Sequence, residues 1–397
     1  MSKEGKATTM GARGADGAVA MAARLLALHG REVRALLGPR GGVAEWGGPP
    51  EGAEAALRFY RQHVAASAPA LIHAATDAWP LPAPWTADDL VRAAGEEAIV
   101  RVAVTPDGRA DAVRRVAAAT GAPAAWGGVH GHFVHETPST TALRFVQPAE
   151  EDMALPALLG ALREEAAIQE PDRPPAVHYA QAQNGSLSSF GALSPAAVPP
   201  ALPWANALFG TGPPDAANVW VGGAASVTAW HRDPYENVYV VLSGEKRFAL
   251  RPPGEGAGVL RPAHVPAARW VRVQGAGAAS WAARPDSPPA TVPWSPAPPP
   301  REWAVPGVDP PPRPGGGVGA DPPPLMVTVP AGSALYLPAF WWHCVSQAPA
   351  PRQPAVIAVN YWYDTLHGPG WAGMLVADRL AGVVAGREEN EEEEEDG

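Results

Sequence analysis

From residue 177 onward the sequence alternates between short apolar runs and turn-forming residues. The runs are too short for ordinary helices, and they are rich in the β-branched and aromatic residues that favour strands. Eight of them lead to residue 363, and they read VHYAQAQ, NVWVG, ENVYVVL, KRFALRP, MVTVP, SALYLP, WHCVSQ and AVIAVNYWY. Many short strands separated by turns predict a sandwich, barrel or jelly roll, and therefore a mainly β fold.

The part of the chain before residue 177 mixes helical and strand patterns. A helix is expected near 18–38 and another at EAALRFYRQHVAAS, with strands at PALIHAA and in EEAIVRVAVTPDGRAD. We assign 17–176 to a helical and strand N-terminal part of one domain and 177–369 to its β core. A C-terminal helix is expected at 370–385.

A proline-rich segment interrupts the predicted β core between residues 285 and 324, where 16 of 40 residues are proline. Proline cannot donate to a sheet ladder, so this segment is excluded from interior strands, and we expect a polyproline or irregular insertion. Such a segment adds little to a core, so we expect it to be protease-sensitive and dispensable for a site in the core. Residues 1–16 and the acidic tail 386–397 are expected to be disordered.

The distribution of charge and cysteine limits the function classes. The formal net charge is −10, and the tail 387–397 carries seven of these ten charges, which leaves a near-neutral body without the signature of nucleic-acid binding. The single cysteine, Cys344, excludes an internal disulfide framework and fits a reducing compartment. No apolar run has the length of a membrane helix. We expect a cytoplasmic protein, with a nuclear pool and, from the basic start of the chain, organelle targeting left open.

A histidine and an aspartate stand two residues apart in AWHRDPYENVYVVLSGEKRFAL, residues 229–250. Because residues i and i+2 of a strand point to the same face, we expect His231 and Asp233 to converge. They would supply two ligands of the 2-His-1-carboxylate set that holds Fe(II). The third would be a histidine from a distant strand, and the strongest candidate is His343 in GSALYLPAFWWHCVSQ, where aromatic residues would fix the ring against a core.

A rival metal cluster is present in VHGHFVHE, which contains His130, His132 and His135. Histidines with this spacing can bind metal, but here they lie in a glycine-rich stretch with no second cluster opposite them. A His-x-Asp pair also occurs by chance, and a lone histidine among aromatic residues is more often part of a core. The combination of the pair with a suitable distant histidine favours the cluster at His231.

A lysine, Lys246, lies across the predicted hairpin from His231. A lysine that points into a barrel is costly unless it is paired. The distal carboxylate of a dicarboxylate cosubstrate would pair with it while the 2-oxo acid end chelates iron, and Thr228 could add a hydroxyl to the same carboxylate. The alternative for Lys246 is an exposed position in the turn.

These stretches resemble the JmjC-domain 2-oxoglutarate oxygenases of the cupin type, and within them a small lysyl hydroxylase branch. The resemblance covers residues from about 57 to 365. Its blocks are LRFYRQHVAASAPALI, VAVTPDGRADAV, FVQP, VHYAQAQNGSL, NVWVGGAASVTAWHRDPYENVYVVLSGEKRFALRPP, VTVPAGSALYLPAFWWHCV and AVNYWYD. The resemblance implies a double-stranded β-helix, the cupin jelly roll, with a helical N-terminal part. The proline-rich insertion, the acidic tail and the Ala/Gly-rich N-terminus depart from the family pattern.

The resemblance also implies the cofactors and the role of each matching residue. Fe(II) would be the metal, with 2-oxoglutarate and O2 as cosubstrates. The protein substrate would be a lysine in a GTPase linked to translation, and the protein would form a homodimer. The implied iron ligands are His231, Asp233 and His343, and the implied 2-oxoglutarate contacts are Tyr179, Thr228 and Lys246, with Asn237 and Asn360 on the cosubstrate side.

Three other functions remain open. A histone-lysine demethylase would use the same chemistry, although the single cysteine argues against zinc-dependent reader modules. An RNA hydroxylase conflicts with the acidic charge balance. A non-enzymatic cupin binding module conflicts with a complete ligand set next to Lys246.

Overall fold

The structure is a computed structural model of the 397-residue chain. It describes residues 42–117, 141–168, 176–210, 212–255, 262–273, 280–304 and 322–365, with single positions between 21 and 37, at 260 and between 372 and 376. The N-terminal residues 1–16, the acidic tail and the three histidines of VHGHFVHE lie outside the described residues, as does most of the predicted helix 370–385. Residues 30–35, within the first predicted helix, are helical.

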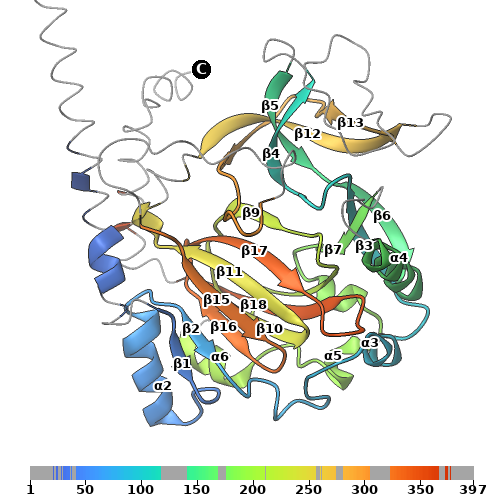
Figure 1. The fold of residues 1–397 in the computed structure, drawn as a ribbon. Coiled ribbons are helices and arrows are strands. Elements are labelled where there is room, and N and C mark those ends of the chain that lie inside the picture. The colour runs from blue at the N-terminus through green and yellow to red at the C-terminus, as the bar shows by residue number, and fades with distance from the viewer. Residues whose placement is uncertain are drawn as a thin grey trace, which may run out of the picture.

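Two sheets form the core of the molecule (Figure 1). In spatial order, the larger contains β1 (Ala44–Trp46), β2 (Ala70–Ile72), β16 (Ala334–Leu337), β10 (Tyr235–Ser243), β18 (Val356–Asp364), β8 (Ala216–Gly222), β7 (Val177–Ala180), β3 (Ile99–Thr105) and β6 (Ala149–Ala154). The smaller contains β15 (Leu325–Pro330), β11 (Glu245–Arg251), β17 (Trp342–Ala348) and β9 (Thr228–His231). Each of the eight strands predicted after residue 177 is present, so the mainly β jelly roll is confirmed.

The two sheets pack face to face through side chains at alternate strand positions. Phe248 and Leu250 of β11 and Val327 of β15 share one buried apolar cluster with Tyr239 of β10 and Leu335 of β16. In β15 the burial alternates strictly between buried and exposed residues, as expected for a strand with one face on a core. This packing forms a barrel whose interior receives every second residue of β10, β11 and β17.

Helices cover the outer face of the larger sheet (Figure 1). They are α2 (Ala53–Phe59), which continues into a π-helical turn at Tyr60–Val64, α3 (Ala87–Ala94), α4 (Leu155–Ala167), α5 (Leu193–Ala196) and α6 (Pro203–Phe209), with short 3-10 turns at Ser186–Ser189 and Pro253–Glu255. In α4 the buried residues are Leu155, Leu158, Leu159 and Leu162, whose spacing places them on one helical face. Within the described residues, no helix is long and apolar enough to span a membrane.

A third sheet lies beside the jelly roll, and the strand pattern of the sequence did not predict it. Its order is β13 (Ser280–Pro285), β12 (Ala263–Val273), β5 (Thr141–Gln147) and β4 (Ala112–Ala117), and β14 (Thr291–Trp294) also pairs with β12. The expectation of an irregular form for 285–324 is therefore wrong at Thr291–Trp294. Proline is tolerated there because β14 pairs with β12 alone among the described strands, so Pro293 lies at an edge of the sheet.

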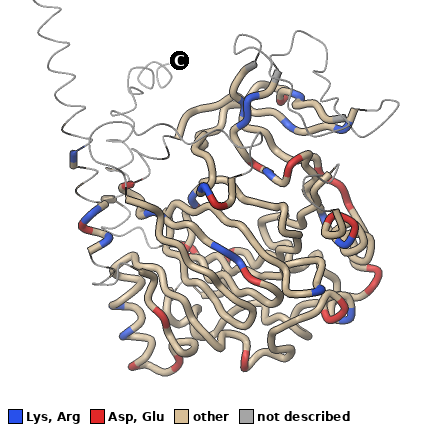
Figure 2. The backbone as a smooth tube through the Cα atoms, viewed as in Figure 1, with Lys and Arg blue, Asp and Glu red and all other residues tan. Residues whose placement is uncertain are grey.

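Basic and acidic positions are interspersed along the outer elements of the molecule (Figure 2). Several of them form ion pairs, such as Arg101 with Asp152 on the neighbouring strand, 2.9 Å apart, and Arg269 of the third sheet with Glu150 of the larger sheet, 3.7 Å apart. This mixture agrees with the near-neutral charge of the chain without its tail.

Candidate functional site

The two histidines and the aspartate of the predicted metal site meet at one end of the smaller sheet. His231 ends β9, and its Cα is the ladder partner of the Cα of His343 in β17. Asp233 Oδ2 lies 3.5 Å from His343 Nε2 and 3.9 Å from His231 Nε2. One ligand atom of each of the three lies within 4.8 Å of the others. The sequence thus predicted the convergence, while the role of these residues as iron ligands stays a prediction.

Backbone contacts fix the turn that carries Asp233. Its carbonyl oxygen accepts a hydrogen bond of 2.7 Å from the amide of Phe340, in the turn between β16 and β17. Phe340 itself has a φ of 65°, in the left-handed region that non-glycine residues seldom adopt. The turn after β9 and the turn before β17 are therefore held together at the metal end of the barrel.

Hydrogen bonds orient both imidazole rings. Nδ1 of His231 lies 2.8 Å from the carbonyl oxygen of Ala229, and Nδ1 of His343 lies 2.9 Å from that of Trp341. A carbonyl only accepts, so each Nδ1 carries the proton and each Nε2 keeps its lone pair toward the cluster. Such backbone partners are what metal-bound histidines use to fix their tautomer.

The pKa shifts of His231 and Asp233 suit a divalent cation. Burial, and next the neighbouring His343, lower the pKa of His231 to about 4, so its ring is neutral at neutral pH. Burial alone would raise the pKa of Asp233, but His231 and His343 outweigh it and the net shift is downward. Two neutral imidazoles and one carboxylate are the donor set of the iron facial triad, so the residues fit Fe(II).

An aromatic residue of the proline-rich segment covers His231. The rings of Trp294 and His231 are stacked, and Trp294 also contacts Phe145 of β5 with ring centroids 4.8 Å apart. Further along this segment, Pro298 accepts a hydrogen bond of 3.0 Å from Trp230, and Trp303 packs against the same apolar cluster as Trp230. The described part of the segment thus packs directly against the candidate metal centre.

Lys246 points into the barrel and is almost fully buried, at 1% exposure. Its Nζ donates a 2.8 Å hydrogen bond to the hydroxyl of Tyr179 and lies 5.0 Å and 5.7 Å from the ring centroids of Tyr179 and Tyr239. Among the described residues no carboxylate pairs with it. Burial lowers the pKa of Lys246 to about 7. The exposed-turn alternative is therefore excluded, and the predicted proximity of Tyr179 and Lys246 is found.

The register of β11 and β17 sets the spacing between Lys246 and the metal end. Leu250 is the ladder partner of His343, and Lys246 is the partner of Gln347. The two ladder pairs are four strand residues apart, which corresponds to about 13 Å along the strand. Because ladder partners, and residues four apart on one strand, share a face of the sheet, Lys246 and His343 point to the same side.

The two predicted asparagines form a buried network in the larger sheet. Asn360 Nδ2 donates to Asn237 Oδ1 at 3.2 Å, and Asn360 Oδ1 accepts from Trp220 Nε1 at 2.8 Å and from Asn218 Nδ2 at 3.3 Å. Thr228 lies opposite Val345, and its hydroxyl has no hydrogen-bond partner in the described part of the chain. Contact of these residues with a cosubstrate stays a prediction.

Two residues of the barrel were not singled out from the sequence. Gln347 faces Lys246 in the ladder and donates to the carbonyl of Gly223 at 2.7 Å, while its buried Oε1 has no partner among the described residues. Tyr239 places its ring beside the lysine ammonium. Both could have been found from alternation, because Gln347 follows His343 by four residues and Tyr239 follows Asn237 by two.

Comparisons with known proteins agree with this geometry. The family model described as Cupin-like domain matches residues 56–368. Bifunctional peptidase and (3S)-lysyl hydroxylase JMJD7 of Homo sapiens is 33% identical over 325 residues, which cover 82% of this chain and 86% of that protein.

Two further relatives match over a similar length. Lysine-specific demethylase JMJ32 of Arabidopsis thaliana is 30% identical over 311 residues, covering 78% of this chain and 79% of that protein. JmjC domain-containing protein E of Dictyostelium discoideum is 27% identical over 320 residues, covering 79% and 82%.

Proposed function

The chain belongs to the cupin-like JmjC family, and from this membership we propose that it is an Fe(II)- and 2-oxoglutarate-dependent protein hydroxylase. Its substrate would be a lysine side chain of a GTPase linked to translation. One observation carries the proposal: a buried lysine without a carboxylate partner among the described residues shares the barrel with a His-Asp-His cluster, four strand residues away in the ladder.

Each residue of the site has a defined task in this proposal. His231, Asp233 and His343 would hold the metal through Nε2, a carboxylate oxygen and Nε2. When bound, the iron supplies the oxygen-activating chemistry by which 2-oxoglutarate loses CO2 to give succinate and one oxygen atom of O2 enters a substrate C–H bond. The backbone hydrogen bonds to both Nδ1 atoms keep the rings in their ligating orientation.

Lys246 and Tyr179 would bind the far end of the cosubstrate. The ammonium group of Lys246 is surrounded by aromatic rings and one neutral hydroxyl, and no counter-charge pairs with it among the described residues. Burial of the unpaired charge is unfavourable, and this lowers the pKa of Lys246. A carboxylate beside Lys246 would return its pKa toward the ordinary value, and the neutral tyrosine hydroxyl could donate to the same oxygen. The apolar walls around them exclude water, which strengthens the ion pair.

A second candidate function is lysine demethylation, favoured by the printed name of the Arabidopsis thaliana relative. Both candidates share the metal, the cosubstrate and a lysine side chain. They differ in the product, because hydroxylation keeps the added oxygen on the side chain whereas demethylation of a methylated lysine releases the methyl carbon.

Mass spectrometry of candidate GTPases distinguishes the two. After incubation with the protein, Fe(II), 2-oxoglutarate and O2, a hydroxylase adds about 16 Da to one lysine. A demethylase leaves unmodified lysine unchanged and lowers the mass of a peptide that contains methylated lysine by about 14 Da for each methyl group removed. His231→Ala and a reaction without 2-oxoglutarate are the controls. Lysine oxidation that persists in both controls would contradict the proposal.

A further inference from the structure

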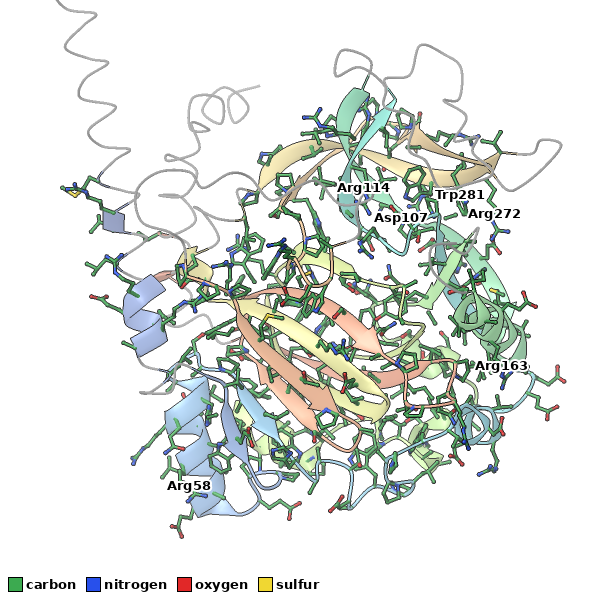
Figure 3. All side chains as sticks on the ribbon, in the orientation of Figure 1. Arg58, Asp107, Arg114, Arg163, Arg272 and Trp281 are labelled. Atoms are coloured by element: carbon green, nitrogen blue, oxygen red, sulfur yellow. The ribbon has the colours of Figure 1, made fainter. Side chains whose placement is uncertain are left out.

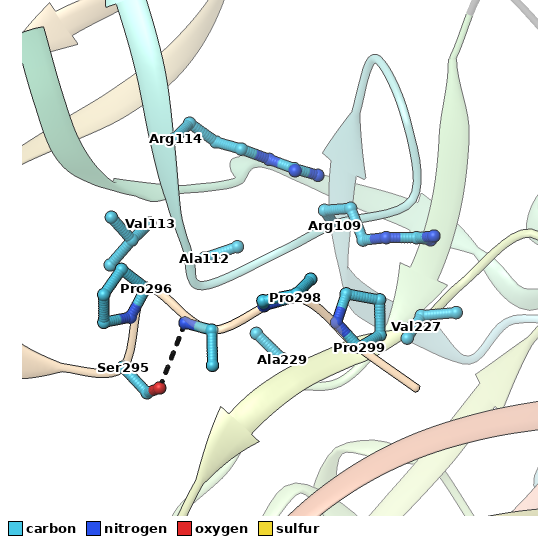
Figure 4. A pocket seen from close by; sticks show the side chains of 11 residues that line it. Arg109, Ala112, Val113, Arg114, Val227, Ala229, Ser295, Pro296, Pro298 and Pro299 are labelled. Atoms are coloured by element: carbon cyan, nitrogen blue, oxygen red, sulfur yellow. Dashed lines mark hydrogen bonds between the residues drawn. The ribbon is translucent and has the colours of Figure 1, made fainter. Parts of the chain in front are cut away.

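The charged groups between the jelly roll and the third sheet are matched with each other or with the backbone. Asp107 pairs with Arg114 at 2.8 Å, and both lie between these two parts of the molecule (Figure 3). In the hollow beside β9, Arg109 donates to the carbonyls of Ala225 and Trp303 (Figure 4). These groups already have partners within the protein. Inside the barrel, by contrast, two polar groups keep unused hydrogen-bonding capacity among the described residues.

Gln347 lies inside the barrel beside Lys246. The two residues are direct ladder partners within β17 and β11, so their side chains share one face of the smaller sheet. Lys246 identifies this face as the interior, because its Nζ donates to the hydroxyl of Tyr179 in the larger sheet. Gln347 is only 5% exposed, so its amide group is enclosed as well.

A glycine brings Gln347 and Tyr179 together. A Cβ on Gly222 would lie 2.5 Å from Cδ2 of Tyr179 and 2.8 Å from Nε2 of Gln347. Both side chains therefore pack over this glycine and occupy the room that a larger residue would take. Because the hydroxyl of Tyr179 is bonded to Lys246, the amide, the phenol and the ammonium group belong to one buried cluster.

Only one end of the Gln347 amide has a partner. Its Nε2 donates a 2.7 Å hydrogen bond to the carbonyl of Gly223, and a carbonyl only accepts, so the other atom is the oxygen. This Oε1 is buried and has no hydrogen-bond partner among the described residues. A buried acceptor without a donor is unfavourable, so Oε1 favours a donor that can turn toward it.

The ammonium group of Lys246 is such a donor. It carries three N–H bonds, and one of them is used by the hydroxyl of Tyr179. The hydroxyls of Tyr179 and Tyr239 are bonded to each other, and burial raises the pKa of both, so both stay neutral near pH 7 to 9. The other ladder partner of Lys246 is the apolar Val329. Among the described groups that face Lys246, Oε1 of Gln347 is therefore the acceptor left for a second N–H.

We propose that Gln347 is a positioning residue for the cosubstrate: its Oε1 accepts one N–H of Lys246 while another N–H binds the distal carboxylate of 2-oxoglutarate. The neutrality of the amide is essential to this role, because it orients the ammonium group without neutralising it. A carboxylate in its place would pair with Lys246 and repel the incoming carboxylate. The inference rests on the proposed function, and it explains how the barrel would prefer a 2-oxo acid with a second carboxylate.

The test compares Gln347→Met and Gln347→Glu with the control variants Gln353→Met and Gln353→Glu. Methionine keeps the length of glutamine without its polar atoms, whereas glutamate keeps the shape and adds a charge. Both changes at Gln347 remove the hydrogen bond to Gly223, so a purely structural role predicts equal losses. Gln353 accepts instead from the amide of Ala87 in α3.

Two ligands report on the distal carboxylate. They are 2-oxoglutarate and 2-oxopentanoate, which has the same carbon chain with a methyl group in place of that carboxylate. Dissociation constants are measured on the Mn(II)-loaded protein without oxygen, and the Mn(II) affinity of each variant shows that the barrel has folded.

We expect the wild type to prefer 2-oxoglutarate. Gln347→Met should weaken its binding by roughly 10-fold, because hydrogen bonds to charged groups are the stronger ones. Gln347→Glu should weaken it by roughly 100-fold or more, and Lys246 should then stay charged, so the affinity should not fall between about pH 7 and 9. Neither change should alter 2-oxopentanoate binding by more than about threefold, and the Gln353 variants should alter neither ligand.

Equal losses for the two ligands would overturn the role of Gln347. So would a Gln347→Glu protein that binds 2-oxoglutarate as well as Gln347→Met does. A Mn(II)-loaded wild type that binds neither 2-oxo acid, or both alike, would instead overturn the proposed function.

Discussion

The indole of Trp294 lies parallel to the imidazole of His231, with ring centroids 5.8 Å apart and an angle of 6° between the planes. The two residues are 63 positions apart in the sequence, and one of them belongs to a segment that composition alone marks as irregular. The contact joins the edge of the third sheet to the candidate metal centre. It therefore makes the described part of the proline-rich segment a wall of the site.

Replacing Trp294 should loosen the metal centre. An aromatic pair of this kind contributes about 0.5–1.5 kcal/mol, so Trp294→Ala should weaken Mn(II) binding by roughly 2- to 12-fold, while Trp294→Phe should keep most of the affinity. Titration of Mn(II) followed by electron paramagnetic resonance measures this. Leu143→Ala, at an exposed position of β5, is the control. An unchanged affinity in Trp294→Ala would support the expectation that the segment is dispensable for metal binding.

The His-Asp-His cluster should bind about one Fe(II), or Mn(II) as a surrogate, per chain. His231→Ala and His343→Ala should each remove most of this binding, because a site that keeps only two of its three ligands holds the ion weakly. His130→Ala, from the rival histidine cluster, should keep it. Metal content after dialysis checks this, and the reverse pattern would show that the site is elsewhere.

Lys246→Ala should reduce cosubstrate affinity much more than metal affinity. Removing one partner of a buried charge pair costs on the order of 2–5 kcal/mol, so the 2-oxoglutarate dissociation constant should rise by roughly 30-fold or more. Lys246→Arg should recover only part of the loss, since a planar guanidinium does not replace a compact ammonium. Titration of 2-oxoglutarate into the Mn(II)-loaded protein without oxygen gives both constants. Equal affinities in wild type and Lys246→Ala would remove this lysine from the cosubstrate site.

The affinity for 2-oxoglutarate should also depend on pH. The pKa of Lys246 is lowered to about 7 in the free site, so the lysine is charged below pH 7 and becomes neutral above it. Only the charged form pairs with the carboxylate, so affinity should fall as the pH rises from about 7 toward 9. Lys246→Arg stays charged throughout and should lose this dependence. Parallel pH profiles of the two proteins would contradict the pairing.

The same pKa predicts how stability without cosubstrate responds to pH. Between about pH 7 and the ordinary lysine value of 10.5, the unfolded chain binds a proton at Lys246 that the folded chain lacks. The contribution of Lys246 to stability should therefore rise with pH across this window. Lys246→Met should raise the melting temperature of the cosubstrate-free protein more at pH 6 than at pH 9.

The jelly roll and its polar centre could be predicted because both follow from alternation along single strands. The strands after residue 177 are marked by apolar runs between turns, and His231, Asp233 and Lys246 stand in one hairpin whose two-residue period fixes their direction. His343 was found because its aromatic neighbours imply a buried ring. The structure adds the ladder that pairs His231 with His343.

The third sheet was not predicted because its pairing is long-range and its strands carry charged residues and proline. β5 and β12 pair in parallel although more than 100 residues separate them, and no local pattern specifies such a partner. Trp294 gains its position from this sheet, through the pairing of β14 with β12. The residue that covers His231 was thus less visible in the sequence than the candidate metal ligands.

β9 has only four residues and lies at the edge of the smaller sheet, and among the described strands it pairs with β17 alone. The candidate ligands lie on both strands and on the turn between β9 and β10. A bound ion would therefore crosslink β9 to β17 and hold this edge strand in the sheet. Mass action would then couple metal occupancy to local opening, with amide exchange in β9 slowed by the ion. An unsealed edge strand is a template for pairing between molecules, so the metal-free protein should be the form that self-associates.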